Sequence, residues 1–131
     1  MANRSIQMPV FSLAGKTAIV TGATKGIGYG IAATFANFGA NVIITARTAS
    51  DVESAAGILN AEYASGGKVI GLAADSAKQE DIDRVVSAAV ESFGRLDILV
   101  NNAGISGKTA KILWRNIPSS YRNKSCGKRK R

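Results

Sequence analysis

The sequence predicts an α/β protein built on a doubly wound, parallel β-sheet with the strand order 3-2-1-4. The first observation is an alternation of short apolar runs with segments of helical periodicity, in the order βαβαβαβ. Strands joined by helix-length connections run parallel, because a tight hairpin cannot join them. The second observation is a glycine-rich turn between the first strand and the first helix, which in such sheets opens at the carboxyl ends of the strands. Because the pattern stops after four strands, we expect an incomplete example of this class.

The first two strands are expected at 17–20 and 41–46, where β-branched residues are frequent. Between them, a helix is expected at 26–38, and Gly39 stands where a glycine commonly ends a helix. Apolar side chains recur along this helix at spacings of four, four and three: Ile27, Ile31, Phe35 and Phe38. This periodicity predicts that these four residues form the buried face.

The third and fourth strands are expected at 68–73 and 96–100. Ser50 and Glu53 have the spacing of a capping box at the start of the second helix. Apolar residues then mark the buried faces of the second and third helices: Val52, Ala56, Leu59 and Tyr63, then Ile82, Val85, Val86, Ala89 and Phe93. We expect the core to include the following residues: Ile19, Val20, Ile27, Ile31, Val42, Ile44, Val69, Val85, Ala89, Leu99 and Val100.

A chain of 131 residues fits one domain. Its formal net charge of +8 is unevenly distributed. Residues 1–106 carry eight lysines and arginines against nine acids, a net of −1, whereas residues 107–131 carry nine basic residues and no acid, a net of +9. We therefore expect an N-terminal arm at 1–10, a folded half-domain at 11–106 and a basic, poorly ordered tail at 107–131.

The residue inventory excludes several classes of site. The sequence has no histidine, which removes imidazole bases and imidazole metal ligands. Its single cysteine, Cys126, cannot form an internal disulfide and suits a reducing compartment. No apolar run reaches the roughly 18 residues of a membrane span. We therefore expect a cytoplasmic protein without a metal site or a membrane partner.

The glycine-rich turn Thr21–Gly28, with the sequence TGATKGIG, indicates a site for a dinucleotide. Glycine lets the backbone turn sharply there and leaves room for a pyrophosphate, and the helix that follows offers free N–H groups to the phosphates. The pattern is typical of a Rossmann-type fold. The candidate cofactor-binding residues in the turn are Gly22, Thr24, Lys25, Gly26, Ile27 and Gly28.

The pattern T-G-x-x-x-G-x-G resembles the cofactor motif of the short-chain dehydrogenase/reductase family. The segment Asn101-Asn102-Ala103-Gly104, directly after the fourth strand, is similar to the second landmark of that family. Asp75, after the third strand, is similar to the family residue that lies beside the adenine. The resemblance runs from about Phe11 to Ser106. It implies an oxidoreductase that transfers hydride between a nicotinamide cofactor and a carbonyl/alcohol substrate, with Asp75, Asn102, Ala103 and Gly104 at the cofactor, and homo-oligomers among full-length relatives.

The residue after the second strand indicates which nicotinamide cofactor is used. An acid at this position would bind the ribose 2′-hydroxyl of NAD, whereas an arginine accommodates the 2′-phosphate of NADP. The sequence has Arg47 here, and Lys25 lies within the glycine-rich turn. Both cations suit a phosphate. We therefore expect NADP(H) rather than NAD(H), and we interpret the nearby Asp51 as a first-turn charge of the second helix.

The catalytic pattern of the family is absent from this sequence. The resemblance implies a tyrosine acid/base, a lysine four residues later that lowers the pKa of the tyrosine, and a serine that holds the substrate oxygen. Four residues after the three tyrosines stand Ala33, Gly67 and Ser125. We therefore expect no catalytic residue in this chain. The change of composition after Gly107 suggests a truncated or frameshifted product, or an alternative transcript.

Two other functions stay open at this point. The chain could be a non-catalytic nucleotide-binding or interaction module, which the missing catalytic pattern favours. Alternatively, the basic tail could bind nucleic acid through its phosphates. However, Trp114 and Tyr121, the aromatic residues of the tail, are not placed as a stacking array. Binding of NADPH but not of DNA would favour the oxidoreductase or the module.

Overall fold

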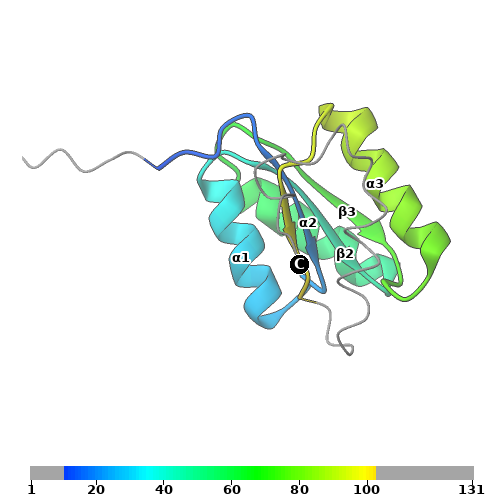
Figure 1. The fold of residues 1–131 in the computed structure, drawn as a ribbon. Helices are drawn as coiled ribbons and strands as arrows, with labels where there is room; N and C mark the ends of the chain where they lie inside the picture. The colour runs from blue at the N-terminus through cyan, green and yellow to red at the C-terminus, as the bar shows by residue number, and fades with distance from the viewer. Residues whose placement is uncertain (1–10, 103–131) are drawn as a thin grey trace, which may run out of the picture.

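The computed structural model describes residues 11–102 of the chain. Four strands form one parallel sheet with the order β3-β2-β1-β4, which confirms the expected fold class and strand order (Figure 1). The strands are β1 (Thr17–Thr21), β2 (Asn41–Ala46), β3 (Val69–Ala73) and β4 (Ile98–Val100). The predicted arm at 1–10 and tail at 107–131 lie outside the described residues.

Three helices connect the strands: α1 (Gly26–Asn37), α2 (Ala49–Glu62) and α3 (Gln79–Phe93). Helices α1 and α2 cover one face of the sheet and α3 covers the other, so the molecule has three layers (Figure 1). The alternation of side chains along β2 divides the core between these faces. Val42 and Ile44 pack toward α1 and α2, whereas Ile43 packs toward α3.

Helix α1 presents a different face to the sheet from the predicted one. The predicted face included Ile27 and Phe38, but these side chains are 76% and 43% exposed. The residues that α1 buries are small, namely Gly28, Ala32 and Ala36. Small side chains let the helix axis approach the sheet closely, and Ile31 and Phe35 then pack partly buried beside this stripe. The prediction that Ile27 belongs to the core was therefore wrong.

The start of α2 also differs from the prediction. The helix begins at Ala49 with Thr48 as its N-cap, and the structure shows no side-chain hydrogen bond at that cap. The proposed capping box of Ser50 and Glu53 was therefore wrong, because both residues already lie inside the helix. In contrast, Asp51 does lie in the first turn of α2, as expected.

Tyr63, predicted on the buried face of the second helix, is instead the C-cap residue of α2 and is 38% exposed. Most of the residues that were predicted for the core are buried. Seven of the predicted residues are buried: Ile19, Val20, Val42, Ile44, Val69, Val85 and Ala89. Ile31, Leu99 and Val100 are half-buried. For Leu99 and Val100 the reason is the position of β4, which pairs only with β1 and forms an edge of the sheet within residues 11–102. No helix in this range is long and apolar enough to cross a membrane.

Candidate functional site

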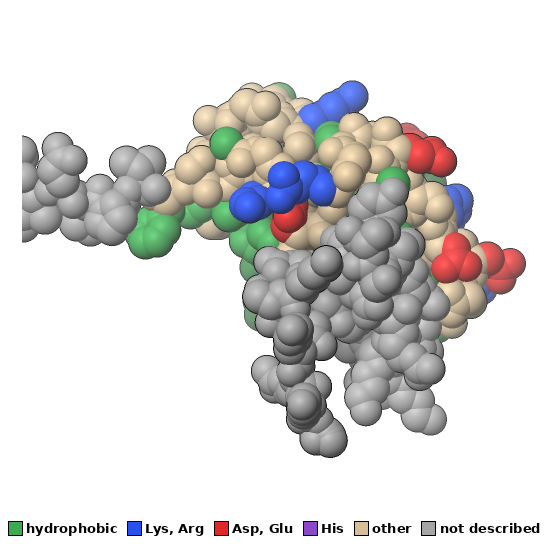
Figure 2. Space-filling view, turned by 45° about the horizontal axis from the view of Figure 1, so that its top comes forward, with side chains coloured by type: hydrophobic (Ala, Val, Ile, Leu, Met, Phe, Trp, Pro, Cys, Tyr) green, Lys and Arg blue, Asp and Glu red, His purple; other side chains and the backbone are tan. Residues whose placement is uncertain are grey.

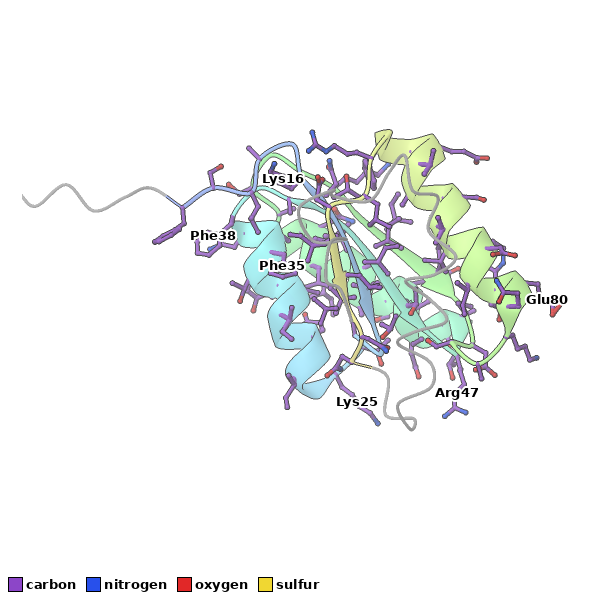
Figure 3. All side chains as sticks on the ribbon, in the orientation of Figure 1. Lys16, Lys25, Phe35, Phe38, Arg47 and Glu80 are labelled. Atoms are coloured by element: carbon purple, nitrogen blue, oxygen red, sulfur yellow. The ribbon has the colours of Figure 1, made fainter. Side chains whose placement is uncertain are left out.

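A cleft of about 350 Å³ opens at the carboxyl ends of the strands. It lies where the loops after β1, β2, β3 and β4 come together, which is the usual ligand position in a doubly wound sheet. Its lining residues are Gly22, Thr24, Lys25, Thr45, Ala46, Arg47, Thr48, Asp51, Ala74, Asp75, Ser76 and Asn102. Figure 3 shows Lys25 and Arg47 extending from the same end of the molecule, opposite Lys16.

The glycine-rich turn forms one wall of the cleft. Gly22 and Gly26 have φ angles of +63° and +65°, a region that side chains with a Cβ atom rarely adopt. The turn is also tied to the neighbouring strand, because the Ala23 N–H donates to the carbonyl oxygen of Thr45 (3.2 Å). The backbone path that the motif predicted is therefore present.

Asn102 fixes the turn from the end of β4. Its side-chain Nδ2 donates to the carbonyl oxygen of Gly22 (3.1 Å), and its backbone N–H donates to Thr21 Oγ1 (3.0 Å). Gly28 leaves the space for this arrangement. A Cβ atom on Gly28 would lie 2.6 Å from the Gly22 carbonyl oxygen and closer still to Asn102 Nδ2. The absence of a side chain at position 28 thus permits contact between the two motif segments.

The loop between β3 and α3 forms the opposite wall, through Ala74, Asp75 and Ser76. The Ala74 N–H donates to the carbonyl oxygen of Ala46 (2.8 Å), which places the loop beside the end of β2. Asp75 shapes the loop itself, because its Oδ1 accepts the Ala77 N–H (2.9 Å) and its carbonyl oxygen accepts the Lys78 N–H (2.9 Å).

The charges around the cleft favour an anion. Lys25 lies in the glycine-rich turn and Arg47 directly follows β2, and both residues are exposed and line the cleft. The N-terminus of α1, which begins at Gly26, has no acidic residue in its first turn and no side-chain hydrogen bond at its cap. Free N–H groups and the helix dipole therefore add positive potential here. Asp51 contributes the opposing charge.

The structure brings together six of the eleven predicted cofactor-binding residues in the cleft lining: Gly22, Thr24, Lys25, Arg47, Asp75 and Asn102. Gly26, Ile27 and Gly28 belong to the turn and to the start of α1 but do not contribute to the lining. Ala103 and Gly104 lie outside the described residues. Asp51, in the first turn of α2, also lines the cleft, although it was not predicted as a site residue. Five further lining residues were missed: Thr45, Ala46, Thr48, Ala74 and Ser76. They stand at the ends of β2 and β3, a position that alone could have indicated them.

The pKa of Tyr29 is shifted in the wrong direction for an acid/base residue. Burial raises the pKa of Tyr29, and the neighbouring Tyr63 and Glu62 add to this effect. A tyrosine that exchanges protons at neutral pH needs the opposite shift. Figure 2 shows acidic side chains gathered on the side of α3. No cluster that could hold a metal ion is present among residues 11–102.

Comparison with known proteins gives matches over most of the chain. A family model described as short chain dehydrogenase matches residues 16–117. Glucose 1-dehydrogenase 2 of Bacillus subtilis is 43% identical over 98 residues, which cover 75% of this chain and 37% of that protein. The chain therefore spans little more than a third of the length of this curated relative.

Two solved structures share the arrangement of strands and helices. L-sorbose reductase from Gluconobacter frateurii, complexed with NADPH and L-sorbose, has a TM-score of 0.72 at 33% identity, over 81% of this chain and 47% of that chain. RhlG from Pseudomonas aeruginosa, in an active-site complex with NADP, has a TM-score of 0.74 at 35% identity, over 86% of this chain and 48% of that chain.

Proposed function

The chain belongs to the short-chain dehydrogenase family, and we propose that its cleft binds NADP(H) as the cofactor site of an oxidoreductase. The reaction class is hydride transfer between the nicotinamide and a carbonyl/alcohol substrate. The relatives named above include a dehydrogenase and a reductase. Since the chain covers 37% of its curated relative, the activity of the whole protein is part of this proposal.

The fit to a dinucleotide pyrophosphate rests on the glycine-rich turn. Its backbone has the positive φ angles at Gly22 and Gly26 that a tight phosphate loop requires, and Gly28 leaves no side chain in the contact between the turn and Asn102. The start of α1 carries no acid that would repel a phosphate. These residues would hold the pyrophosphate through backbone N–H groups.

One observation supports the preference for NADP(H): Lys25 and Arg47 line the same cleft from two different loops. Two cations near one position favour a dianionic 2′-phosphate over a neutral hydroxyl. The complexes of L-sorbose reductase with NADPH and of RhlG with NADP support the same choice.

When bound, the nicotinamide supplies the hydride chemistry. The residues of this chain would bind and orient the cofactor, with Asp75 and Ser76 on the wall formed by the β3–α3 loop and Asn102 holding the glycine-rich turn. No tyrosine of the 131 residues has a lysine four positions later. We therefore assign no proton transfer to the residues of this chain.

Calorimetric titration of the chain with NADPH and NADH tests the cofactor preference. We expect tighter binding of NADPH, and we expect Arg47→Asp to weaken NADPH binding by about ten- to a hundredfold, the loss of one charge-assisted contact. Lys68→Asp is the matched control, because Lys68 is also exposed but precedes β3, at the end of the strand away from the cleft. Equal affinity of the unmutated chain for both cofactors would overturn the preference.

The alternative, a nucleotide-binding module without catalysis, is favoured by the absence of the tyrosine–lysine spacing in these 131 residues. An assay of NADPH oxidation with a panel of ketones separates the two functions. Binding of NADPH without turnover above the buffer blank supports the module. Turnover by the chain would show that proton transfer uses residues other than the family pattern.

A further inference from the structure

We propose that Asp81 and Arg84 are positioning residues that hold the β3–α3 loop in the shape that the adenine end of the cofactor requires. The Asp81–Arg84 pair lies on α3, whereas the loop residues Ala74, Asp75 and Ser76 line the cleft. The inference rests on the proposed function, because it assigns a role toward the same cofactor.

The pair contacts the loop backbone at two points. Asp81 Oδ2 accepts the Asp75 N–H (2.8 Å), and Arg84 Nη2 donates to the carbonyl oxygen of Ala73 (2.8 Å). Arg84 Nη2 also donates to Asp81 Oδ1 (3.0 Å), which joins the two contacts into one unit. The hydrogen bond from the Asp75 N–H lowers the pKa of Asp81 below its ordinary value, and the hydrogen bond from Arg84 lowers it further. The carboxylate is therefore charged at neutral pH.

These contacts attach the short β3–α3 loop to the helix that follows it. Five residues, 74–78, join the end of β3 to the start of α3. Asp75 contacts Ala77 and Lys78, the N-cap residue of α3, which ties the loop to the start of the helix. These contacts do not provide an attachment to the helical residues that follow the cap. The Asp81–Arg84 pair supplies that attachment, on both sides of Ala74. A change at Asp81 would thus move Asp75 at the cleft wall.

Asp81 does not line the 350 Å³ cleft. It lines a neighbouring hollow of about 270 Å³, together with Arg47, Asp75 and Lys78. Removing its charge could therefore act on Arg47 as well as on the loop. The two effects have opposite signs. Loss of a negative charge near Arg47 would strengthen binding of the 2′-phosphate, whereas a displaced loop would weaken binding of every ligand that contains adenine.

The first arm of the test is calorimetric titration of Asp81→Asn and Arg84→Gln with NADPH, NADH and 5′-AMP. In Asp81→Asn we expect the affinities for NADH and 5′-AMP to fall by a similar factor of about three to ten, the range for one lost hydrogen bond. The affinity for NADPH should also fall, but by less, because the lost negative charge near Arg47 offsets part of the loss. Arg84→Gln keeps the Asp81 carboxylate and should give a smaller loss in the same direction. Asp83→Asn is the matched control, because its carboxylate accepts a hydrogen bond from Gln79 within α3 and contacts no loop residue among those described.

The second arm measures amide hydrogen exchange without ligand. We expect faster exchange at residues 74–78 in Asp81→Asn and Arg84→Gln, and unchanged exchange in Asp83→Asn. If the unmutated chain binds none of the three ligands, the proposed function fails and this inference fails with it. If the unmutated chain binds them and Asp81→Asn binds them equally well, or binds NADPH alone more tightly, the proposed function stands and this inference is overturned.

Discussion

Asn102 donates a hydrogen bond from its side-chain Nδ2 to the carbonyl oxygen of Gly22 (3.1 Å), although 80 positions separate them in the sequence. The bond joins the end of β4 to the glycine-rich turn after β1. It means that the two motif segments of the sequence act as one structural unit. The shape of the turn therefore depends on strand pairing as well as on its own glycines.

Gly28→Ala tests this unit directly. The new Cβ atom would meet the Gly22 carbonyl oxygen at 2.6 Å, so we expect loss of the Asn102–Gly22 bond, destabilisation of about 1 to 3 kcal/mol and at least a tenfold loss of dinucleotide affinity. Gly30→Ala, also in α1, is the control, because a Cβ atom there meets nothing within 4 Å. It should stabilise the chain by about 0.5 to 1 kcal/mol. Urea unfolding and calorimetry measure both effects, and equal behaviour of the two variants would contradict the prediction.

Asp51→Asn should strengthen NADPH binding. Asp51 lines the cleft with Lys25 and Arg47, so its charge opposes the 2′-phosphate. We expect an increase in NADPH affinity of about twofold to fivefold, the size of an exposed charge interaction, and no change for NADH. The gain should shrink as salt is added. Glu53→Gln, also exposed on α2, controls for net charge, and a similar gain in that variant would refute a local effect of Asp51.

Asp97 should make the stability of the chain depend on pH. Burial alone would raise the pKa of Asp97, but hydrogen bonds from Arg95 (2.7 and 2.8 Å) and from the Thr17 N–H (2.9 Å) outweigh it and lower the pKa. A lowered folded-state pKa means that the stabilisation is present above the ordinary value of 3.8 and is lost as the pH falls through the folded-state pKa. Asp97→Asn should cost about 1 to 2 kcal/mol at neutral pH.

The measurement for Asp97 is urea unfolding of both proteins from about pH 6 to about pH 3. The difference between the unmutated chain and Asp97→Asn should narrow toward the acid end, because protonated Asp97 no longer attracts Arg95. Glu91→Gln, on the exposed side of α3, should show no such narrowing. A difference that stays constant with pH would mean that the side chain acts through packing alone.

Replacing Ile27 or Ile31 with alanine tests which face of α1 is buried, because the same side chain is removed from two positions on the helix. Ile27 is 76% exposed, so Ile27→Ala should change the free energy of unfolding by less than about 0.5 kcal/mol. Ile31 packs against the core, and Ile31→Ala should cost at least about 1 kcal/mol more. Thermal unfolding of the two variants measures the difference. Equal losses would show that α1 turns the face predicted by the periodicity toward the sheet.

The class of fold, the order of the strands and the two cations of the cleft follow from the amino-acid sequence without coordinates. Runs of β-branched residues such as Val42–Thr45 form strands wherever both faces are covered, and helix-length connections leave only parallel pairing. The carboxyl ends of parallel strands meet at one edge. For that reason, the sequence predicts that Lys25 and Arg47 lie at the same edge of the sheet, and both residues line the cleft.

The buried face of α1 and the residues that complete the cleft depend on packing in three dimensions. Two stripes one position apart, Ile27–Ile31–Phe35 and Gly28–Ala32–Ala36, share the period of the helix, and they differ by about 100° around its axis. Hydrophobicity favours the first stripe. Close approach to the sheet selects the second, because a side chain at position 28 would collide with Gly22 and Asn102. Contacts such as Asn102–Gly22 and Asp81–Asp75 depend on distances in space, which no local period of the sequence encodes.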